Sequence, residues 1–118
     1  MSVTTAEVAE IIRGVSTRVI DPGFRRLSPD QIHEKAPGDL VTDLDRQAEG
    51  ELSRLLTSAG GGIVVGEESV HDDASVLQEL PTAELAWVID PIDGTKNYVN
   101  GSTHHAVMVA EVQHLSLI

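Results

Sequence analysis

Apolar residues recur at the spacing of an amphipathic helix in two segments of the first half of the chain. The first segment is predicted to form a helix over residues 5–20, because Thr4 and Glu7 have the spacing of an N-terminal capping box. Its predicted buried stripe consists of Val8, Ile12, Val15 and Val19. The sequence Asp21-Pro22-Gly23 then ends the helix, and the scattered prolines of residues 24–38 predict a loop that contains a short helical turn.

A second helix is predicted to begin at Thr42 or Asp43 and to end at the glycine run of residues 60–62. Its expected buried residues, again three or four positions apart, are Leu44, Ala48, Leu52 and Leu55. After the glycines the runs of apolar residues become shorter and richer in β-branched side chains, which indicates a change from helix to strand.

Three apolar runs in the second half predict strands. They are GIVVG before Glu67, ELAWVID ending at Asp90, and residues 104–112, the last of which is expected to be buried. Between the first two runs, DDASVLQEL predicts a short exposed helix. Two helices followed by strands with short helical insertions indicate an α+β fold, in which helices are layered on a sheet, rather than a strict βαβ alternation.

The length and composition set the size of the fold. At 118 residues the chain is expected to form one domain. Because only 3% of the residues are aromatic, its core is expected to consist of Val, Ile, Leu and Ala. Such a core is small for a domain that is stable by itself.

Charge and cysteine content exclude several classes of function. Eight basic and nineteen acidic residues give a formal net charge of −11, which argues against nucleic acid or an anionic membrane as a partner. An anionic substrate would therefore need local positive charge, such as a bound metal. The absence of Cys excludes a disulfide framework, a thiolate metal site and a Cys nucleophile. The N-terminus has no basic and apolar leader and no apolar run reaches roughly 18 residues, so we expect a cytoplasmic protein.

The sequence DPIDGT places two carboxylates three residues apart at the end of the second predicted strand. Pro91 restricts the backbone between Asp90 and Asp93, so that both carboxylates can converge on one point. Two close carboxylates repel each other, which favours a Mg²⁺ ion between them, and the Ile92 carbonyl could add a neutral oxygen ligand. The alternative is an ordinary turn, because Asp-Pro and Asp-Gly are frequent turn pairs.

Two neighbouring features strengthen the interpretation as a site. Gly94 permits the close approach of an anion, and a helix that begins near Thr95 would direct its first N–H groups toward a phosphate. Glu67 and Glu68 follow another predicted strand and add carboxylates at a second strand end. The alternative for this acidic pair is a solvated loop.

In chain order, the motifs DLVTDLD, GEES and DPIDGT resemble those of the inositol monophosphatase family, a group of Mg²⁺-dependent, lithium-sensitive phosphatases. The resemblance extends over about residues 4–112. It implies that residues 1–118 form the N-terminal, metal-binding portion of the layered α/β sandwich of that family, with helices packed on a largely antiparallel sheet and the C-terminal half absent.

The resemblance also implies roles for individual residues. The positions that correspond to family metal ligands are Glu67, Asp90, the Ile92 carbonyl and Asp93. Gly94 and Thr95 correspond to the positions that meet the substrate phosphate and the attacking water, and Asp45 would pair with the threonine to deprotonate that water. Lys35 lies near the position of a phosphate-binding lysine, whereas Glu68 receives no ligand role.

The implied reaction is hydrolysis of a small phosphate monoester, such as inositol 1-phosphate, by metal-activated water. Because DGTKN also occurs in relatives that act on histidinol phosphate or phosphoadenosine phosphates, these are alternative substrates. The second half of family members supplies a further metal-binding aspartate in a Trp-Asp motif, but here the single Trp87 precedes Val88. We therefore expect a weakly active or inactive chain whose uncovered sheet associates with a second copy or another partner. A non-catalytic Mg²⁺- or partner-binding fragment is the alternative.

Overall fold

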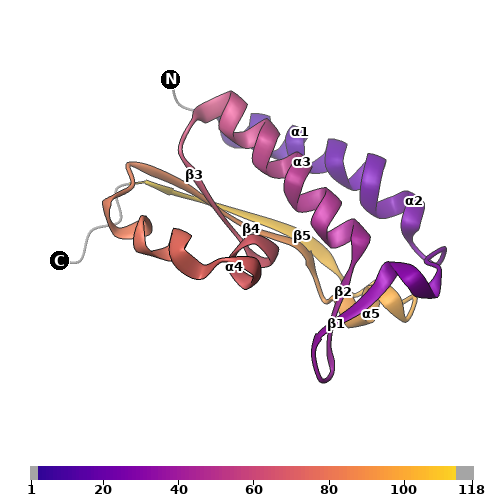
Figure 1. Ribbon diagram of the computed structural model, residues 1–118. Helices are drawn as coiled ribbons and strands as arrows, with labels where there is room; N and C mark the ends of the chain where they lie inside the picture. The colour runs from indigo at the N-terminus through magenta and orange to yellow at the C-terminus, as the bar shows by residue number, and fades with distance from the viewer. Residues whose placement is uncertain (1–2, 114–118) are drawn as a thin grey trace.

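The computed structural model describes residues 3–113 as two helices packed on a sheet, with a hairpin and short helices between them (Figure 1). The α-helices are α1 (Thr5–Val15), α2 (Asp21–Gly23), α3 (Asp43–Gly60), α4 (Glu67–Asp72) and α5 (Thr95–Val99). The π-helix is η1 (Ser16–Ile20), and the 3-10 helices are η2 (Pro29–Gln31), η3 (Ala74–Gln78) and η4 (Leu80–Thr82). The strands are β1 (Ile32–Ala36), β2 (Asp39–Thr42), β3 (Ile63–Gly66), β4 (Leu85–Asp93) and β5 (Ala106–Gln113).

The main sheet has the strand order β3-β4-β5, with β4 in the centre. Strand β3 is parallel to β4, whereas β5 is antiparallel to it, and β1 and β2 form a separate antiparallel hairpin. Helices α1 and α3 lie side by side over one face of the main sheet (Figure 1). The predicted α+β class, with helices packed on a largely antiparallel sheet, is therefore confirmed.

The first helical segment begins as predicted but is less regular. Thr4 caps α1 through a reciprocal capping box with Glu7. The helix then widens into a π-helical turn over Ser16–Ile20 before Pro22 and Gly23 end it. Val15 is completely buried, as the periodicity predicted.

Helix α3 has the predicted ends but a different buried stripe. Thr42 accepts a hydrogen bond from the Asp45 N–H as the N-cap, and Gly61 follows the last turn with a positive φ of 72°. Ala48 and Leu52 are buried as expected, whereas Leu44 and Leu55 are only half-buried. The remaining buried positions are Asp45, Glu49 and Leu56. The stripe is thus rotated by about one residue, and two carboxylates lie on it.

Two expectations for the strands were wrong. The predicted loop over residues 24–38 contains strand β1, which pairs with β2 and makes the segment a hairpin. Strand β5 begins at Ala106 instead of residue 104, and alternate side chains on it are exposed because no element covers that face within residues 3–113. The short exposed helix predicted in DDASVLQEL is present as the 3-10 helix η3.

The core lies between the two long helices and the sheet. Trp87 and Tyr98 are its largest fully buried side chains, so the core is not purely aliphatic. The Trp87 indole Nε1 donates to the Gly61 carbonyl at 2.9 Å, and the Tyr98 hydroxyl donates to the Ile20 carbonyl at 2.6 Å. The first bond joins the glycine run to strand β4, and the second joins the end of η1 to helix α5. None of the helices in residues 3–113 has the length and apolarity that crossing a membrane would require.

Candidate metal and phosphate site

A β-bulge in strand β4 places Asp90 and Asp93 on the same side of the sheet. Asp90 is paired with Met108 and Asp93 with Ala106, so three steps on β4 face two steps on β5. In a regular strand, residues three apart would point to opposite faces, and the extra residue corrects this difference. Pro91 fits a bulge because it has no N–H group to donate to the ladder.

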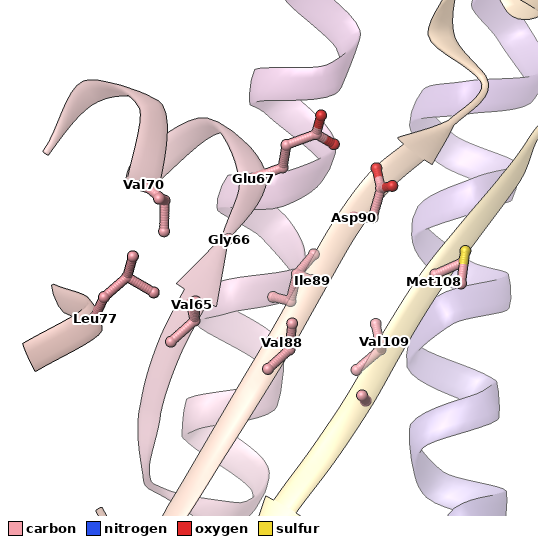
Figure 2. Close-up of a pocket in the computed structure, with 11 residues that line it drawn as sticks. Val65, Gly66, Glu67, Val70, Leu77, Val88, Ile89, Asp90, Met108 and Val109 are labelled. Carbon is pink, nitrogen blue, oxygen red and sulfur yellow. The ribbon is translucent and has the colours of Figure 1, made fainter. Parts of the chain in front are cut away.

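The parallel register of β3 and β4 brings Glu67 to the same place. Gly66 is paired with Ile89, so Glu67 and Asp90 are the next residues at the carboxyl ends of two neighbouring parallel strands. Figure 2 shows both carboxylates together at this end of the strands. This edge of a parallel pair is where α/β proteins bind ligands.

Six of the eight predicted site residues line one cavity of about 230 Å³: Glu67, Asp90, Ile92, Asp93, Gly94 and Thr95. Lys96 and, from the β1–β2 hairpin, Gly38, Asp39 and Leu40 complete its lining. Asp45 and Lys35 are not part of the lining. The proposed metal ligands therefore lie together, and the hairpin, part of which was predicted as a loop, contributes to the wall of the cavity.

Asp90 has the electrostatic properties of a cation ligand. Burial, together with the nearby carboxyl groups of Glu67 and Asp93, raises its pKa to about 7. Its Oδ1 is buried and has no hydrogen-bond partner among the described residues. A divalent cation would satisfy this oxygen and remove the repulsion among the three carboxylates, so the donor set fits Mg²⁺.

The carboxylates are near one another without forming a closed coordination shell. Within residues 3–113, no group of three or more His, Cys, Asp and Glu side chains is arranged so that it could hold a metal ion by itself. Glu67 is half-exposed, and its Oε1 lies 3.5 Å from the Lys35 Nζ. The Ile92 carbonyl accepts a hydrogen bond from the Thr95 hydroxyl at 3.0 Å. Binding a cation would thus require small movements of these ligands.

Asp45 and Thr95 form a hydrogen-bonded pair, in which Asp45 is buried and Thr95 lines the cavity. Asp45 Oδ2 accepts from the N–H and the hydroxyl of Thr42 at 2.8 and 2.6 Å, while Asp45 Oδ1 lies 3.0 Å from the Thr95 hydroxyl. Burial raises the pKa of Asp45, although the hydrogen bonds from Thr42 and Thr95 oppose the shift. The Thr95 hydroxyl has one proton, so it donates to either Asp45 or Ile92 at a given moment.

Gly94 holds the turn that joins the acidic strand to helix α5. Its φ of 84° lies in the left-handed region, and a Cβ at this position would lie 2.8 Å from the His104 carbonyl oxygen. The helix that begins at Thr95 confirms the predicted helix start. Glycine is therefore required both by the backbone conformation and by the space available.

Lys35 contacts the acidic residues instead of lining the cavity. Its Nζ lies 3.3 Å from Glu68 Oε1, and both side chains are almost fully buried. Burial lowers the pKa of Lys35, but the charges of Glu68 and Glu67 outweigh that effect and leave the pKa raised. Burial also raises the pKa of Glu68, which Lys35 partly offsets. Glu68 was predicted to have no ligand role, and in the structure it pairs with Lys35, which also lies near Glu67.

The acidic site lies at one end of a larger apolar cavity of about 460 Å³ (Figure 2). This cavity covers the sheet face opposite α1 and α3, and its lining includes Val65, Val70, Leu77, Val88, Met108 and Ala110. Leu77, Val88 and Met108 are the large hydrophobic side chains that are exposed in the described part of the chain. An apolar surface of this kind commonly binds another polypeptide.

Comparisons with known proteins agree with the geometry. The sequence profile of the Inositol monophosphatase family matches residues 2–114. The fructose-1,6-bisphosphatase/inositol-1-monophosphatase of Aquifex aeolicus (strain VF5) is 33% identical over 108 residues, which are 91% of this chain and 38% of that protein. The Nus factor SuhB of Pseudomonas aeruginosa is 37% identical over 88 residues, which are 74% of this chain and 31% of that protein.

A solved structure shows the same fold. The IMPase of Thermotoga maritima matches with a TM-score of 0.70 at 24% identity, over 89% of this chain and 37% of that one. This chain thus spans less than two fifths of the length of each of these three proteins. Because the family profile covers almost the entire sequence, the chain belongs to the inositol monophosphatase family.

Proposed function

We propose that this chain carries the Mg²⁺-binding and water-activating part of a phosphomonoesterase. The observation that carries the proposal is the convergence of Glu67, Asp90 and Asp93 on one cavity that Thr95 also lines, with Asp45 hydrogen-bonded to Thr95 behind it. These residues come from three separate motifs, so an ordinary surface turn would not account for their meeting. The substrate would be a small phosphate monoester such as inositol 1-phosphate.

The proposed metal ligands are Glu67, Asp90, Asp93 and the Ile92 carbonyl. Mg²⁺ held by them would lower the pKa of water and neutralise the phosphate charge. Hard oxygen ligands of this kind suit Mg²⁺. The cation would also allow a chain with a formal charge of −11 to accept an anionic substrate.

Asp45 and Thr95 would supply the base. Asp45 Oδ1 can accept the Thr95 hydroxyl proton, which frees the Thr95 oxygen to accept a proton from water. The raised pKa of Asp45 makes it a better proton acceptor than an exposed aspartate. Gly94 leaves space for a phosphate oxygen beside this pair.

The test is phosphate release from inositol 1-phosphate with and without Mg²⁺. We expect release that depends on Mg²⁺ and falls roughly tenfold or more in Asp93→Asn. Glu10→Gln, which removes an exposed carboxylate on α1, should match the unmodified chain. Folded protein that releases no more phosphate than Asp93→Asn would exclude catalysis by this chain. Histidinol phosphate and a phosphoadenosine phosphate, tested in parallel, would identify an alternative substrate.

The second candidate is a non-catalytic protein that binds Mg²⁺ or a protein partner. Two observations favour it: the relative from Pseudomonas aeruginosa is named a Nus factor, and the sheet has an exposed apolar cavity. Mg²⁺ binding by calorimetry without phosphate release from any of the three substrates would select this candidate. Turnover that Asp93→Asn abolishes would select the phosphatase.

We also propose an occupant for the exposed sheet face. The three compared proteins are much longer than this chain, and a polypeptide equivalent to their remaining length would cover Val88 and Met108. A second copy is a weaker candidate because each copy carries a formal charge of −11. Sedimentation at increasing concentration and salt tests the second copy: a salt-dependent dimer supports self-association, whereas a monomer throughout excludes it.

A further inference from the structure

Glu49 is a buried carboxylate that takes no part in the metal and phosphate cavity. Its side chain lies on α3, one turn after Asp45, and the residue is 6% exposed. Within residues 3–113 it forms no ion pair with a basic side chain. A carboxylate in such surroundings needs strong hydrogen bonds to remain stable.

Both oxygens of Glu49 accept hydrogen bonds from the backbone of α4. Oε1 accepts from the Glu68 N–H at 2.7 Å, and Oε2 accepts from the Ser69 N–H at 2.8 Å. These N–H groups lie in the first turn of α4, where no helical carbonyl can satisfy them. The negative charge of Glu49 also interacts favourably with the positive end of the helix.

Glu67 is the first residue of α4 and directly precedes the two residues that Glu49 holds. We propose that Glu49 is a positioning residue, which fixes the backbone that presents Glu67 to the metal cavity. The inference rests on the proposed function, because it gives Glu67 the role of a Mg²⁺ ligand. Glu49 acts only through the backbone and touches neither metal nor substrate.

Gly66 and Ser69, which lie before and after Glu67 in the sequence, also support this arrangement. A Cβ on Gly66 would collide with the Glu49 carboxyl group, so the close approach of α3 to this turn requires glycine. The φ of Gly66 is −103°, which any residue can adopt, so space and not backbone strain sets the requirement. The Ser69 hydroxyl lies 3.2 Å from both the N–H and the carbonyl of Gly66, which closes the turn around Glu67.

The alternative is that Glu49 only stabilises the fold, and Mg²⁺ affinity separates the two roles. Glu49→Gln keeps one acceptor oxygen but places an NH₂ group against the second N–H. Glu51→Gln is the matched control, because it removes the same charge from the same helix while its partner is Arg18. Gly66→Ala perturbs the Glu49 contact without changing any charge.

The experiment uses the full 118-residue chain, with Mg²⁺ titration by calorimetry and amide hydrogen exchange without metal. All variants are measured below their unfolding transitions. We expect Glu49→Gln and Gly66→Ala to weaken Mg²⁺ binding by about 10–100-fold, and Glu51→Gln to change it less than about twofold. In Glu49→Gln, exchange should accelerate at Glu68 and Ser69.

The outcomes distinguish the inference from the proposed function. If Asp90→Asn loses Mg²⁺ binding but folded Glu49→Gln and Gly66→Ala bind as tightly as the unmodified chain, the positioning role is overturned and the metal site remains. If Glu49→Gln does not fold, Gly66→Ala decides by the same criterion. If the unmodified chain shows no Mg²⁺ binding that depends on Asp90, the proposed function fails, and the inference fails with it.

Discussion

Gly94 should tolerate alanine much less well than Gly38, although both have a similar, positive φ. Their φ values are 84° and 78°, both in the left-handed region. A Cβ on Gly94 would lie 2.8 Å from the His104 carbonyl oxygen, whereas a Cβ on Gly38 would meet nothing within 4 Å. Comparing Gly94→Ala with Gly38→Ala therefore separates the steric contact from the conformational cost.

The expected free energies follow from these contacts. The left-handed conformation destabilises the folded state of an alanine variant by about 1–2 kcal/mol. Alanine also lowers the conformational entropy of the unfolded chain, which stabilises the variant by about 0.4–1 kcal/mol. Gly38→Ala should therefore lower the unfolding free energy by about 1 kcal/mol. Gly94→Ala adds an overpacking cost of about 1–3 kcal/mol. The His104 oxygen cannot move away freely, because it accepts a hydrogen bond from Asn97 Nδ2 at 2.9 Å.

Urea unfolding followed by far-ultraviolet circular dichroism measures the difference. With an m value of about 2 kcal/mol/M, the midpoint of Gly94→Ala should lie about 0.5–1.5 M below that of Gly38→Ala. Equal midpoints for Gly94→Ala and Gly38→Ala would refute the steric argument and leave only the conformational one.

Three further predictions concern buried polar groups. The pKa of Asp90 is raised to about 7, so without Mg²⁺ its contribution to stability is complete below about pH 4 and is lost as the pH rises through 7. The urea midpoint of the unmodified chain should therefore fall over this pH range, and that of Asp90→Asn should fall less. An equal fall in both proteins would contradict the assignment. Tyr98→Phe leaves the buried Ile20 carbonyl without its partner and should lower the unfolding free energy by about 1–3 kcal/mol, whereas an unchanged thermal midpoint would contradict this. Lys35→Met leaves Glu68 buried and unpaired and should lower the unfolding free energy by about 3–5 kcal/mol. The double variant Lys35→Met/Glu68→Gln should largely restore it. Equal losses of unfolding free energy in the two variants would argue against the pair.

Short-range sequence patterns were sufficient to predict the ends of α3 and the acidic turn of residues 90–95. The capping threonines and the glycine run fixed both ends of α3, because these residues act through their immediate neighbours. The spacing of Asp90 and Asp93 around Pro91 indicated that the two carboxylates would meet. The end of the neighbouring strand added Glu67, the start of the next helix added Thr95, and the resemblance to a family added Asp45. Glu67 and Thr95 line the same cavity as this turn.

The features that sequence reasoning missed depend on contacts between distant segments. Strand β1 has little periodicity of its own and exists through pairing with β2. The burial of Glu49 and Glu68 was not predicted, because buried carboxylates break the rule that charged side chains lie on the surface. The sequence did contain an indication of this burial, since Asp45, Glu49 and Leu52 also recur at helical spacing. It can be interpreted only once the hydrogen-bond partners from other elements are known, such as the Glu68 N–H that donates to Glu49.

The bulge in β4 means that the separation of the two aspartates is a matter of parity as well as distance. Deleting one residue between Asp90 and Asp93 would remove the bulge and leave the two aspartates two residues apart, on the same face of a regular strand but with a different backbone between them. Adding one residue would shift the pairing with β5 of every residue that follows. The length of this segment is therefore as much a part of the site as its side chains, and a one-residue insertion in the gene would damage the site more than most exchanges of side chain.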